Sequence, residues 1–372
     1  MNKVCVVGAS LSGLYAAKEA AINGADVTVI ERRKDVGTVL KCGEMFTTIY
    51  GRPPEKCIVR EIKNWIFDFS LVTGLEKSSP VTVNLPDSFC VMTDRATHER
   101  LLKEECLRLE VKFEFDRPYV HDAEGYDYII IAKGASSWEK GKAFAMAYTV
   151  SCDGKVSWDY AYFKVLPSNE GYYWYFPKNN NEMNIGYGYS LTSFGGGYTL
   201  IKSGKIDYVD VLLNAEKKIT FSEKIQSGGG IIPMNTDYKD IRNYYDIEKK
   251  NVLFVGDVAG MVNPMLSGGA HLAMISGQIA GYSCATKNSV ESVMSNYYNG
   301  ITTLIAPEME IGIMVNNMRE LMSPTEFYDF MSGALESSYL KMNDTMIHYI
   351  QRIMPKYRNI ADVGNDELEE LV

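Results

Sequence analysis

Six residues near the start of the chain have the types and spacing of a dinucleotide-binding turn. Residues 8–13 read Gly-Ala-Ser-Leu-Ser-Gly and lie between an apolar run and a helical pattern. In such a turn the first glycine allows a tight bend, the last lets the helix pack closely, and the N–H groups at the helix start bind a pyrophosphate. Glu31, 18 residues after Gly13, ends the next apolar run and is placed to bind a ribose diol. The pattern predicts that Gly8, Ser10, Gly13 and Glu31 bind a dinucleotide, with Ser10 in place of the middle glycine.

A second candidate site follows the apolar run 251–255. Residues 256–260 read Gly-Asp-Val-Ala-Gly, and Gly268 and Gly269 precede a helical stretch. Asp257 at a strand end can bind sugar hydroxyls, and a helix start beside it favours negative charge on a bound ring. On spacing alone, a strand-to-helix turn without a ligand is the alternative.

The elements that must position these residues can be read from the hydrophobic pattern. The runs 3–7, 27–30, 128–132 and 251–255 have the composition of buried parallel strands. Residues 12–23, 97–109 and 268–286 have helical patterns, residues 143–235 predict a mostly antiparallel sheet, and residues 289–355 predict amphipathic helices beginning again at Ser323-Pro324. We therefore expect an α/β fold: a Rossmann-like nucleotide-binding domain interrupted by an antiparallel-sheet substrate domain, with C-terminal helices.

The expected domain bounds follow from that order. The nucleotide-binding domain takes residues 1–50, 90–140 and 250–288. The substrate-binding domain takes residues 51–89 and 141–249, and residues 289–372 form a C-terminal helical region. Residues 258–286 carry no Asp, Glu, Lys or Arg, but their glycines and polar residues favour a buried loop and helix over a membrane span.

Composition excludes several function classes. A net charge of −9 and the lack of a Lys/Arg block argue against a nucleic-acid partner. Seven cysteines without a C-x-x-C pair predict reduced thiols and no metal site. The apolar run begins at residue 3, so we expect no signal peptide and a cytoplasmic location.

Three motifs together resemble the FAD signatures of the para-hydroxybenzoate hydroxylase-like flavoproteins. They are residues 8–13 with Glu31, the pair Asp94-Arg95, and residues 256–260. The resemblance implies FAD as the cofactor, with Arg95 near its phosphates and Asp257 on its ribityl chain. Lys133 replaces an Asp that helps NAD(P)H reduction in hydroxylases of this group, which puts direct NAD(P)H reduction in doubt. The expected FAD-binding residues are Gly8, Ser10, Gly13, Glu31, Arg32, Cys42, Arg95, Gly134, Asp257, Gly268 and Gly269.

Further motifs narrow the resemblance to geranylgeranyl reductases. Residues 41–44 (Lys-Cys-Gly-Glu) are similar to the cysteine loop of that family, and residues 172–177 (Tyr-Tyr-Trp-Tyr-Phe-Pro) to its aromatic substrate motif. Residues 227–233 and 263–269 also match its later segments. The resemblance implies an isoprenoid lipid substrate, whose long apolar chain needs a cavity with apolar walls. The expected substrate-binding residues are Tyr172, Trp174, Phe176, Pro177 and Gly186.

Alkene reduction by FAD needs a hydride for one carbon and a proton for the other. Cys42 is the first candidate for the catalytic proton donor, directly or through water, and Glu44 is the second. The alternative is that Cys42 is only a small buried side chain. The four histidines, His98, His121, His271 and His348, are isolated in the sequence, and we assign none of them a ligand or base role.

Other activities and partners stay open at this stage. A flavin-dependent halogenase or monooxygenase is one alternative. Residues 172–177 resemble the Trp-x-Trp-x-Ile-Pro motif of halogenases, but Tyr172 and Phe176 depart from it. A flavin-binding module without catalysis is another. The expected partners are an isoprenoid lipid and an electron donor, either a ferredoxin-like protein or NAD(P)H. The lipid also implies peripheral contact with a membrane.

Overall fold

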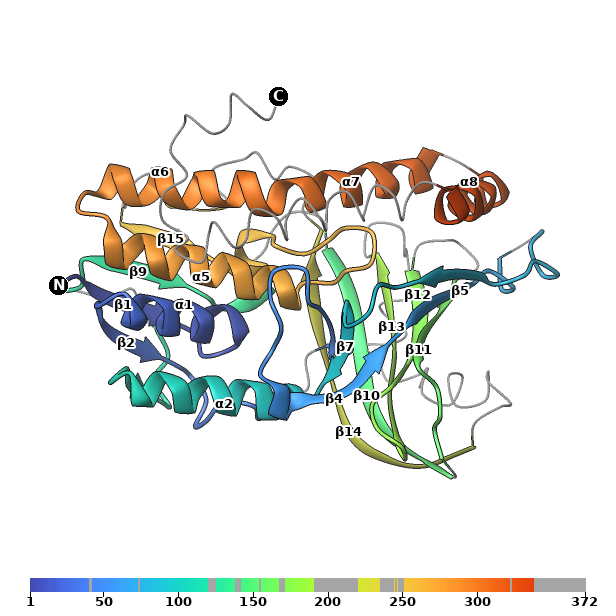
Figure 1. The fold of residues 1–372 in the computed structure, drawn as a ribbon, viewed down its shortest axis with the longest axis horizontal. Helices are drawn as coiled ribbons and strands as arrows, with labels where there is room; N and C mark the ends of the chain where they lie inside the picture. The colour runs from blue at the N-terminus through green and yellow to red at the C-terminus, as the bar shows by residue number, and fades with distance from the viewer. Residues whose placement is uncertain are drawn as a thin grey trace.

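A five-stranded parallel sheet forms one end of the molecule (Figure 1). The computed structural model describes residues 1–39, 42–72, 74–119, 125–137, 142–153, 155–166, 171–190, 220–234, 244, 246, 251–321 and 323–337. The strand order is β15 (Val252–Phe254), β9 (Tyr128–Ile131), β1 (Lys3–Val7), β2 (Asp26–Ile30) and β8 (Lys112–Glu114), and all pairs are parallel. The four apolar runs predicted as parallel strands are confirmed. Their residues are mostly apolar because side chains on both faces of the sheet are buried.

Helices α1 (Leu11–Ile22) and α5 (Ala270–Thr286) pack directly against each other. A Cβ atom at Gly277 would overlap Ser12 O, and one at Gly281 would overlap Ala16 O, so glycine at both positions allows the close approach. This contact buries most of α5, the helical part of the charge-free stretch 258–286, against protein, as predicted. Among the described helices, none combines the length and apolar character needed to cross a bilayer.

A seven-stranded sheet forms the other end of the molecule (Figure 1). Its order is β14 (Thr220–Pro233), β10 (Lys142–Asp153), β13 (Glu182–Ser190), β12 (Gly171–Pro177), β11 (Tyr160–Val165), β5 (Asn64–Asp68) and β6 (Val81–Asn84). The pairs are antiparallel as predicted, except that β5 and β11 run parallel. Strands β5 and β6 come from an earlier part of the chain, so the sheet joins two separate segments.

A three-stranded sheet lies between these two parts, with the order β3 (Met45–Thr47), β7 (Cys90–Thr93) and β4 (Ile58–Ile62). Short 3-10 turns η1 (Glu55–Cys57), η2 (Gly134–Ser137) and η4 (Gly256–Ala259) join the strands to their neighbours. Asp94 is the N-cap of helix α2 (Arg95–Arg108), and its side chain accepts a hydrogen bond from Thr97 N at 2.7 Å. This cap fixes the position of Arg95 at the first helical residue.

The C-terminal helices form a layer along the molecule (Figure 1). They are α6 (Val290–Gly300), the π-helical segment η5 (Ile301–Ile305), α7 (Ala306–Leu321) and α8 (Pro324–Ser337). Ser323 and Glu326 cap α8 with reciprocal hydrogen bonds, which confirms the predicted helix start. The predicted helices beyond residue 337 lie outside the described residues. The domain bounds given above stay a prediction.

Candidate active site

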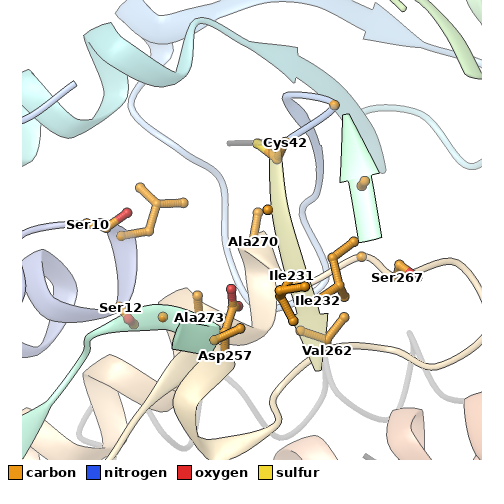
Figure 2. A pocket seen from close by; sticks show the side chains of 18 of the residues that line it. Ser10, Ser12, Cys42, Ile231, Ile232, Asp257, Val262, Ser267, Ala270 and Ala273 are labelled. Atoms are coloured by element: carbon orange, nitrogen blue, oxygen red, sulfur yellow. The ribbon is translucent and has the colours of Figure 1, made fainter. Parts of the chain in front are cut away.

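A cavity of about 860 Å³ opens between the carboxyl ends of the parallel strands and one face of the seven-stranded sheet. Figure 2 shows Ser10 and Ser12 on one side of it and Ile231, Ile232 and Ser267 on the other. Most residues predicted from the sequence line it: Gly8, Ser10, Glu31, Arg32, Cys42, Arg95, Gly134, Tyr172, Trp174, Phe176, Asp257, Gly268 and Gly269. Gly13, Glu44, Pro177 and Gly186 do not line it, although Glu44 and Gly186 contact residues that do.

The glycine turn at the start of the chain has the geometry that its sequence requires. Gly8 has a φ of +108°, and a Cβ atom there would overlap Ala132 O. A Cβ atom at Gly13 would overlap Gly8 O, so this glycine lets α1 pack on the turn. Ser10 precedes α1, but its side chain donates to Glu99 Oε1 at 2.7 Å and leaves the helix start uncapped.

Glu31 is held at the edge of the same cavity. It is 6% exposed, and its two carboxylate oxygens accept hydrogen bonds from Ala9 N at 2.8 Å and Arg33 N at 2.9 Å. These bonds orient the carboxylate before any ligand binds. An acid held in this way at the end of the second strand fits the role of a ribose-binding residue.

Arg95 is a largely buried cation on this side of the cavity, with its side chain 13% exposed. Its guanidinium contacts Glu99 Oε1 at 3.0 Å, Ser10 Oγ at 3.0 Å and Cys42 Sγ at 3.6 Å. Burial lowers the pKa of Arg95, but the charge of Glu99 outweighs it, so the pKa lies above its usual value and the side chain stays charged. Glu99 was not predicted as a site residue. Its position four residues after Arg95 in a predicted helix could have indicated the ion pair, because residues four apart lie on the same helix face.

These features together fit a flavin dinucleotide. Gly8 and Gly13 allow the tight turn that brings the start of α1 to the cavity. The start of α1 offers free N–H groups, and the largely buried Arg95 guanidinium can neutralise phosphate charge. Asp257 lines the same cavity, together with Gly268 and Gly269, which precede α5. The residues present can therefore hold FAD.

Glu44 lies in a buried hydrogen-bond network behind the cavity. It is 4% exposed with a φ of +62°, and Lys178 Nζ lies 3.0 and 2.9 Å from its two oxygens. Arg95 N donates to Oε1 at 3.2 Å, and Asn184 Nδ2 donates to Oε2 at 3.1 Å. A carboxylate engaged by a lysine and two further donors is suited to fixing the loop around it rather than to releasing a proton.

Asn184 extends this network to the aromatic strand. Its Nδ2 also donates to Cys42 O at 3.2 Å, and its Oδ1 accepts from Trp174 Nε1 at 2.9 Å. Asn184 and Glu44 therefore couple the orientation of Trp174 to the position of the Cys42 loop. Lys178 and Asn184 were not predicted as site residues. Lys41, which belongs to the same motif as Cys42, lies outside the described residues.

Cys42 lines the cavity between its two halves: Arg95 lies 3.6 Å from its sulfur on one side, and the next residue, Gly43, packs against Phe176 and Trp174 on the other. Burial raises the pKa of the Cys42 thiol, and the nearby Arg95 guanidinium only partly offsets this. Glu44 N donates to the sulfur at 3.4 Å. The thiol is therefore protonated at neutral pH, as a proton donor must be.

The aromatic wall is formed by alternate residues of β12. Tyr172, Trp174 and Phe176 lie on one face of the strand and line the cavity. Gly186 on the neighbouring strand leaves room for the Trp174 ring, because a Cβ atom there would overlap the indole. The Trp174 ring therefore packs against the backbone of Gly186. Pro177 is the last residue of β12.

Small residues continue this face of the sheet next to the aromatic wall. Ala145 of β10, Gly188 of β13 and Gly230 of β14 are register partners across three adjacent strands, and all three line the cavity. Because one of these residues is alanine and two are glycine, the cavity stays open beside Trp174. The cavity therefore has one apolar half, made of aromatic and small residues, and one half suited to a nucleotide.

Comparisons with known proteins agree with this arrangement. Residues 6–51 match the family model described as an NAD(P)-binding Rossmann-like domain. The chain is 22% identical to digeranylgeranylglycerophospholipid reductase 3 of Methanosphaera stadtmanae, covering 95% of this chain and 96% of that protein. It is 25% identical to digeranylgeranylglycerophospholipid reductase of Methanococcus vannielii, covering 97% and 92%.

Solved structures confirm the predicted fold class. A geranylgeranyl bacteriochlorophyll reductase-like protein from Thermoplasma acidophilum superimposes with a TM-score of 0.72 at 19% identity, covering 100% of this chain and 99% of that one. The halogenase PltM superimposes with a TM-score of 0.67 at 11% identity, covering 97% and 84%. The chain therefore shares its α/β architecture with a geranylgeranyl bacteriochlorophyll reductase-like protein and with a halogenase.

Proposed function

We infer that this chain is a flavin-dependent reductase that hydrogenates C=C bonds of geranylgeranyl chains in glycerolipids of the archaeal type. One observation carries this conclusion: a single cavity joins a nucleotide-binding half to an apolar half, with the Cys42 thiol where the two meet. The similarity to digeranylgeranylglycerophospholipid reductases over nearly the whole chain supports the same substrate class. The resemblance to geranylgeranyl reductases expected from the motifs is confirmed.

We propose FAD as the cofactor. The reduced form of FAD would supply the hydride, and this chain's residues would hold the cofactor. The turn at Gly8 and the start of α1 would bind the pyrophosphate, Glu31 the ribose and Arg95 a phosphate charge. Asp257 would bind the sugar-like chain next to the ring. Each of these side chains or turns already lines one continuous cavity.

The remaining residues would bind the substrate and supply the proton. Tyr172, Trp174 and Phe176 would hold the isoprenoid chain, and exclusion of water by their rings would strengthen polar interactions inside the cavity. Cys42 would give its proton to the alkene carbon that does not receive the hydride. Glu44 and Asn184 would hold the Cys42 loop in place from behind.

An anaerobic reoxidation experiment tests this function. The purified chain should show the visible spectrum of bound flavin and, once reduced, should reoxidise when a digeranylgeranylglycerophospholipid is added. The product should gain two hydrogens per double bond by mass spectrometry. NAD(P)H and a reduced ferredoxin, supplied in separate reactions, identify the electron donor.

Three results would contradict the proposal. A reduced protein that ignores the lipid but reoxidises in oxygen with halide-dependent or oxygenated products would be a halogenase or monooxygenase. A bound flavin that resists every reductant would indicate a non-catalytic module. A chain that takes up no FAD would remove the cofactor assignment.

Peripheral membrane contact follows from the substrate, because the lipid tail must leave a bilayer to reach the cavity. We expect the chain to float with liposomes that contain a geranylgeranyl lipid, and to float less without it. Flotation assays with neutral and anionic liposomes measure this. A chain that stays in the dense fraction with all three would require another route for the lipid.

A further inference from the structure

Two glycines that line the cavity, Gly188 of β13 and Gly230 of β14, are not required by the backbone or by packing. Neither has the positive φ that favours glycine. A Cβ atom at Gly188 would have its three nearest heavy atoms at 3.8 Å, an ordinary van der Waals distance, and one at Gly230 would have none within 4 Å. Because glycine weakens the interior of a strand, its presence at both positions has another cause.

Two other glycines on the same strands are required by packing. A Cβ atom at Gly186 would lie 2.2 Å from a backbone oxygen of β10, and one at Gly229 would lie 2.3 Å from another. Gly229 and Gly230 are adjacent in one strand, so their side chains would point to opposite faces of the sheet. Gly186 and Gly229 therefore let the strands pair closely, whereas Gly188 and Gly230 keep space free on the cavity face.

The two glycines of the cavity face belong to one row of residues that crosses the sheet. Tyr172 of β12 is the register partner of Gly188, and Ala145 of β10 is the register partner of both glycines. All four residues line the cavity, and the Trp174 ring lies beside the Gly188 end of the row. Neighbouring strands are about 4.8 Å apart, so the row is about 14 Å long. We call this row, from Tyr172 to Gly230, the sheet groove.

The Gly230 end of the sheet groove lies toward the part of the cavity assigned to the flavin. Strand β14 contacts η4, the turn that carries Asp257. Figure 2 shows Ile231 and Ile232, the next residues of β14, near Asp257 and Val262. The sheet groove therefore runs from the aromatic wall toward the residue proposed to bind the cofactor next to its ring.

We propose that Gly188 and Gly230 determine the substrate specificity of this cavity, because the lack of side chains there lets one long isoprenoid chain lie along the sheet groove. The proposal rests on the proposed function and names the part of the same cavity that takes the chain. An isoprenoid chain carries a methyl branch in every unit, so it is thicker than a linear chain and needs a flat floor. A side chain at either glycine would occupy the space that this chain needs.

The two glycines act on different lengths of chain. The rings of Tyr172 and Trp174 lie at the Gly188 end and offer the larger apolar contact, so a short chain binds at that end. A long chain covers the same end and extends to Gly230. A side chain at Gly188 therefore obstructs short and long chains, while one at Gly230 obstructs long chains alone.

The test is equilibrium binding of two isoprenoid alcohols to the FAD-loaded, oxidised full chain, measured by calorimetry at a fixed detergent concentration. Geranylgeraniol has four isoprene units and geraniol has two. Each CH₂ group that leaves the cavity lowers the affinity about fourfold. We therefore expect Gly188→Leu to weaken the binding of both alcohols by about tenfold or more. Gly230→Leu should weaken geranylgeraniol by about tenfold or more and change geraniol by less than about threefold.

Matched variants separate this role from a general effect of substitution. Gln226 is exposed on β14, four residues before Gly230 and outside the cavity, so Gln226→Leu should leave both affinities unchanged. Gly188→Ala should keep or raise the melting temperature, whereas Gly186→Ala should lower it, because only the second Cβ atom overlaps the backbone. Gly188→Val and Gly230→Val, with smaller side chains, serve if a leucine variant does not fold.

The outcomes distinguish this proposal from the proposed function. Gly188→Leu and Gly230→Leu proteins that bind geranylgeraniol as tightly as the wild type overturn the proposal. So does an equal loss of both alcohols in Gly230→Leu, or a wild type that binds neither alcohol. A wild type and variants that show the expected affinities, in a protein that fails to reduce the lipid, would contradict the proposed function alone.

Discussion

Replacing Cys42 by alanine is expected to lower the rate of alkene reduction by about 10²- to 10⁴-fold, the usual contribution of a positioned general acid. The thiol lines the cavity where its two halves meet, and its neighbours hold it there: Glu44 N at 3.4 Å and the Arg95 guanidinium at 3.6 Å. Single-turnover reoxidation of the reduced flavin by lipid, followed anaerobically, measures the effect. Flavin content and reduction by dithionite should stay unchanged.

The pH dependence of this step follows from the direction of the Cys42 pKa. Burial raises that pKa above the usual thiol value, so the proton needed for donation is present at neutral pH. It is lost only as the pH rises through the raised pKa. The single-turnover rate of the wild type should therefore hold through neutral pH and fall only in alkaline solution, and Cys42→Ala should lack that fall.

Cys106 offers a matched control. It is buried in α2, its pKa is raised to about 12 by burial, and it does not line the cavity. Cys106→Ala should therefore leave the single-turnover rate close to wild type. If Cys42→Ala reduces the alkene as fast as Cys106→Ala, Cys42 is only a packed side chain and the proton has another source.

Local sequence patterns identified many of the residues that line the half of the cavity assigned to the nucleotide. The turn at Gly8, the acid Glu31 and the strand-end Asp257 all lie near in sequence to the strands and helices that place them. Short-range patterns carry such information because the residues and the elements that orient them are a few positions apart. The alternation of Tyr172, Trp174 and Phe176 likewise follows from the period of one strand.

Short-range patterns could not predict the hydrogen bonds and ion pairs that join distant parts of the chain around the cavity. Lys178 and Glu44 are 134 residues apart, and His271 and Glu308 are 37 residues apart on different helices. Nothing in the spacing of either pair indicates contact. The same limit applies to β5, which joins the seven-stranded sheet by a parallel pairing with β11. These features depend on how separate segments pack, and the sequence alone supported Glu44 only as a candidate acid.

Lys178→Met is expected to lower the free energy of unfolding by about 3–5 kcal/mol, because it leaves the Glu44 carboxylate buried without its cation. Lys178 is 6% exposed and lies 2.9 Å from Glu44 Oε2 and 3.5 Å from Asp94 Oδ2. Chemical denaturation of the two proteins measures the difference. We also expect the loop that carries Cys42 to become more mobile, because Asn184 donates hydrogen bonds to both Cys42 O and Glu44 Oε2.

A double variant separates the loss of the pair from the loss of packing. Glu44→Gln combined with Lys178→Met removes both charges, and we expect it to regain much of the stability lost by Lys178→Met alone. Burial lowers the pKa of Lys178, but Glu44 and Asp94 outweigh it and the pKa is raised. The wild type should therefore lose this contribution as the pH rises through the raised pKa, and the double variant should not. Equal stabilities of wild type and Lys178→Met would mean that Glu44 is neutralised by some other group, and the positioning role given to it here would fail.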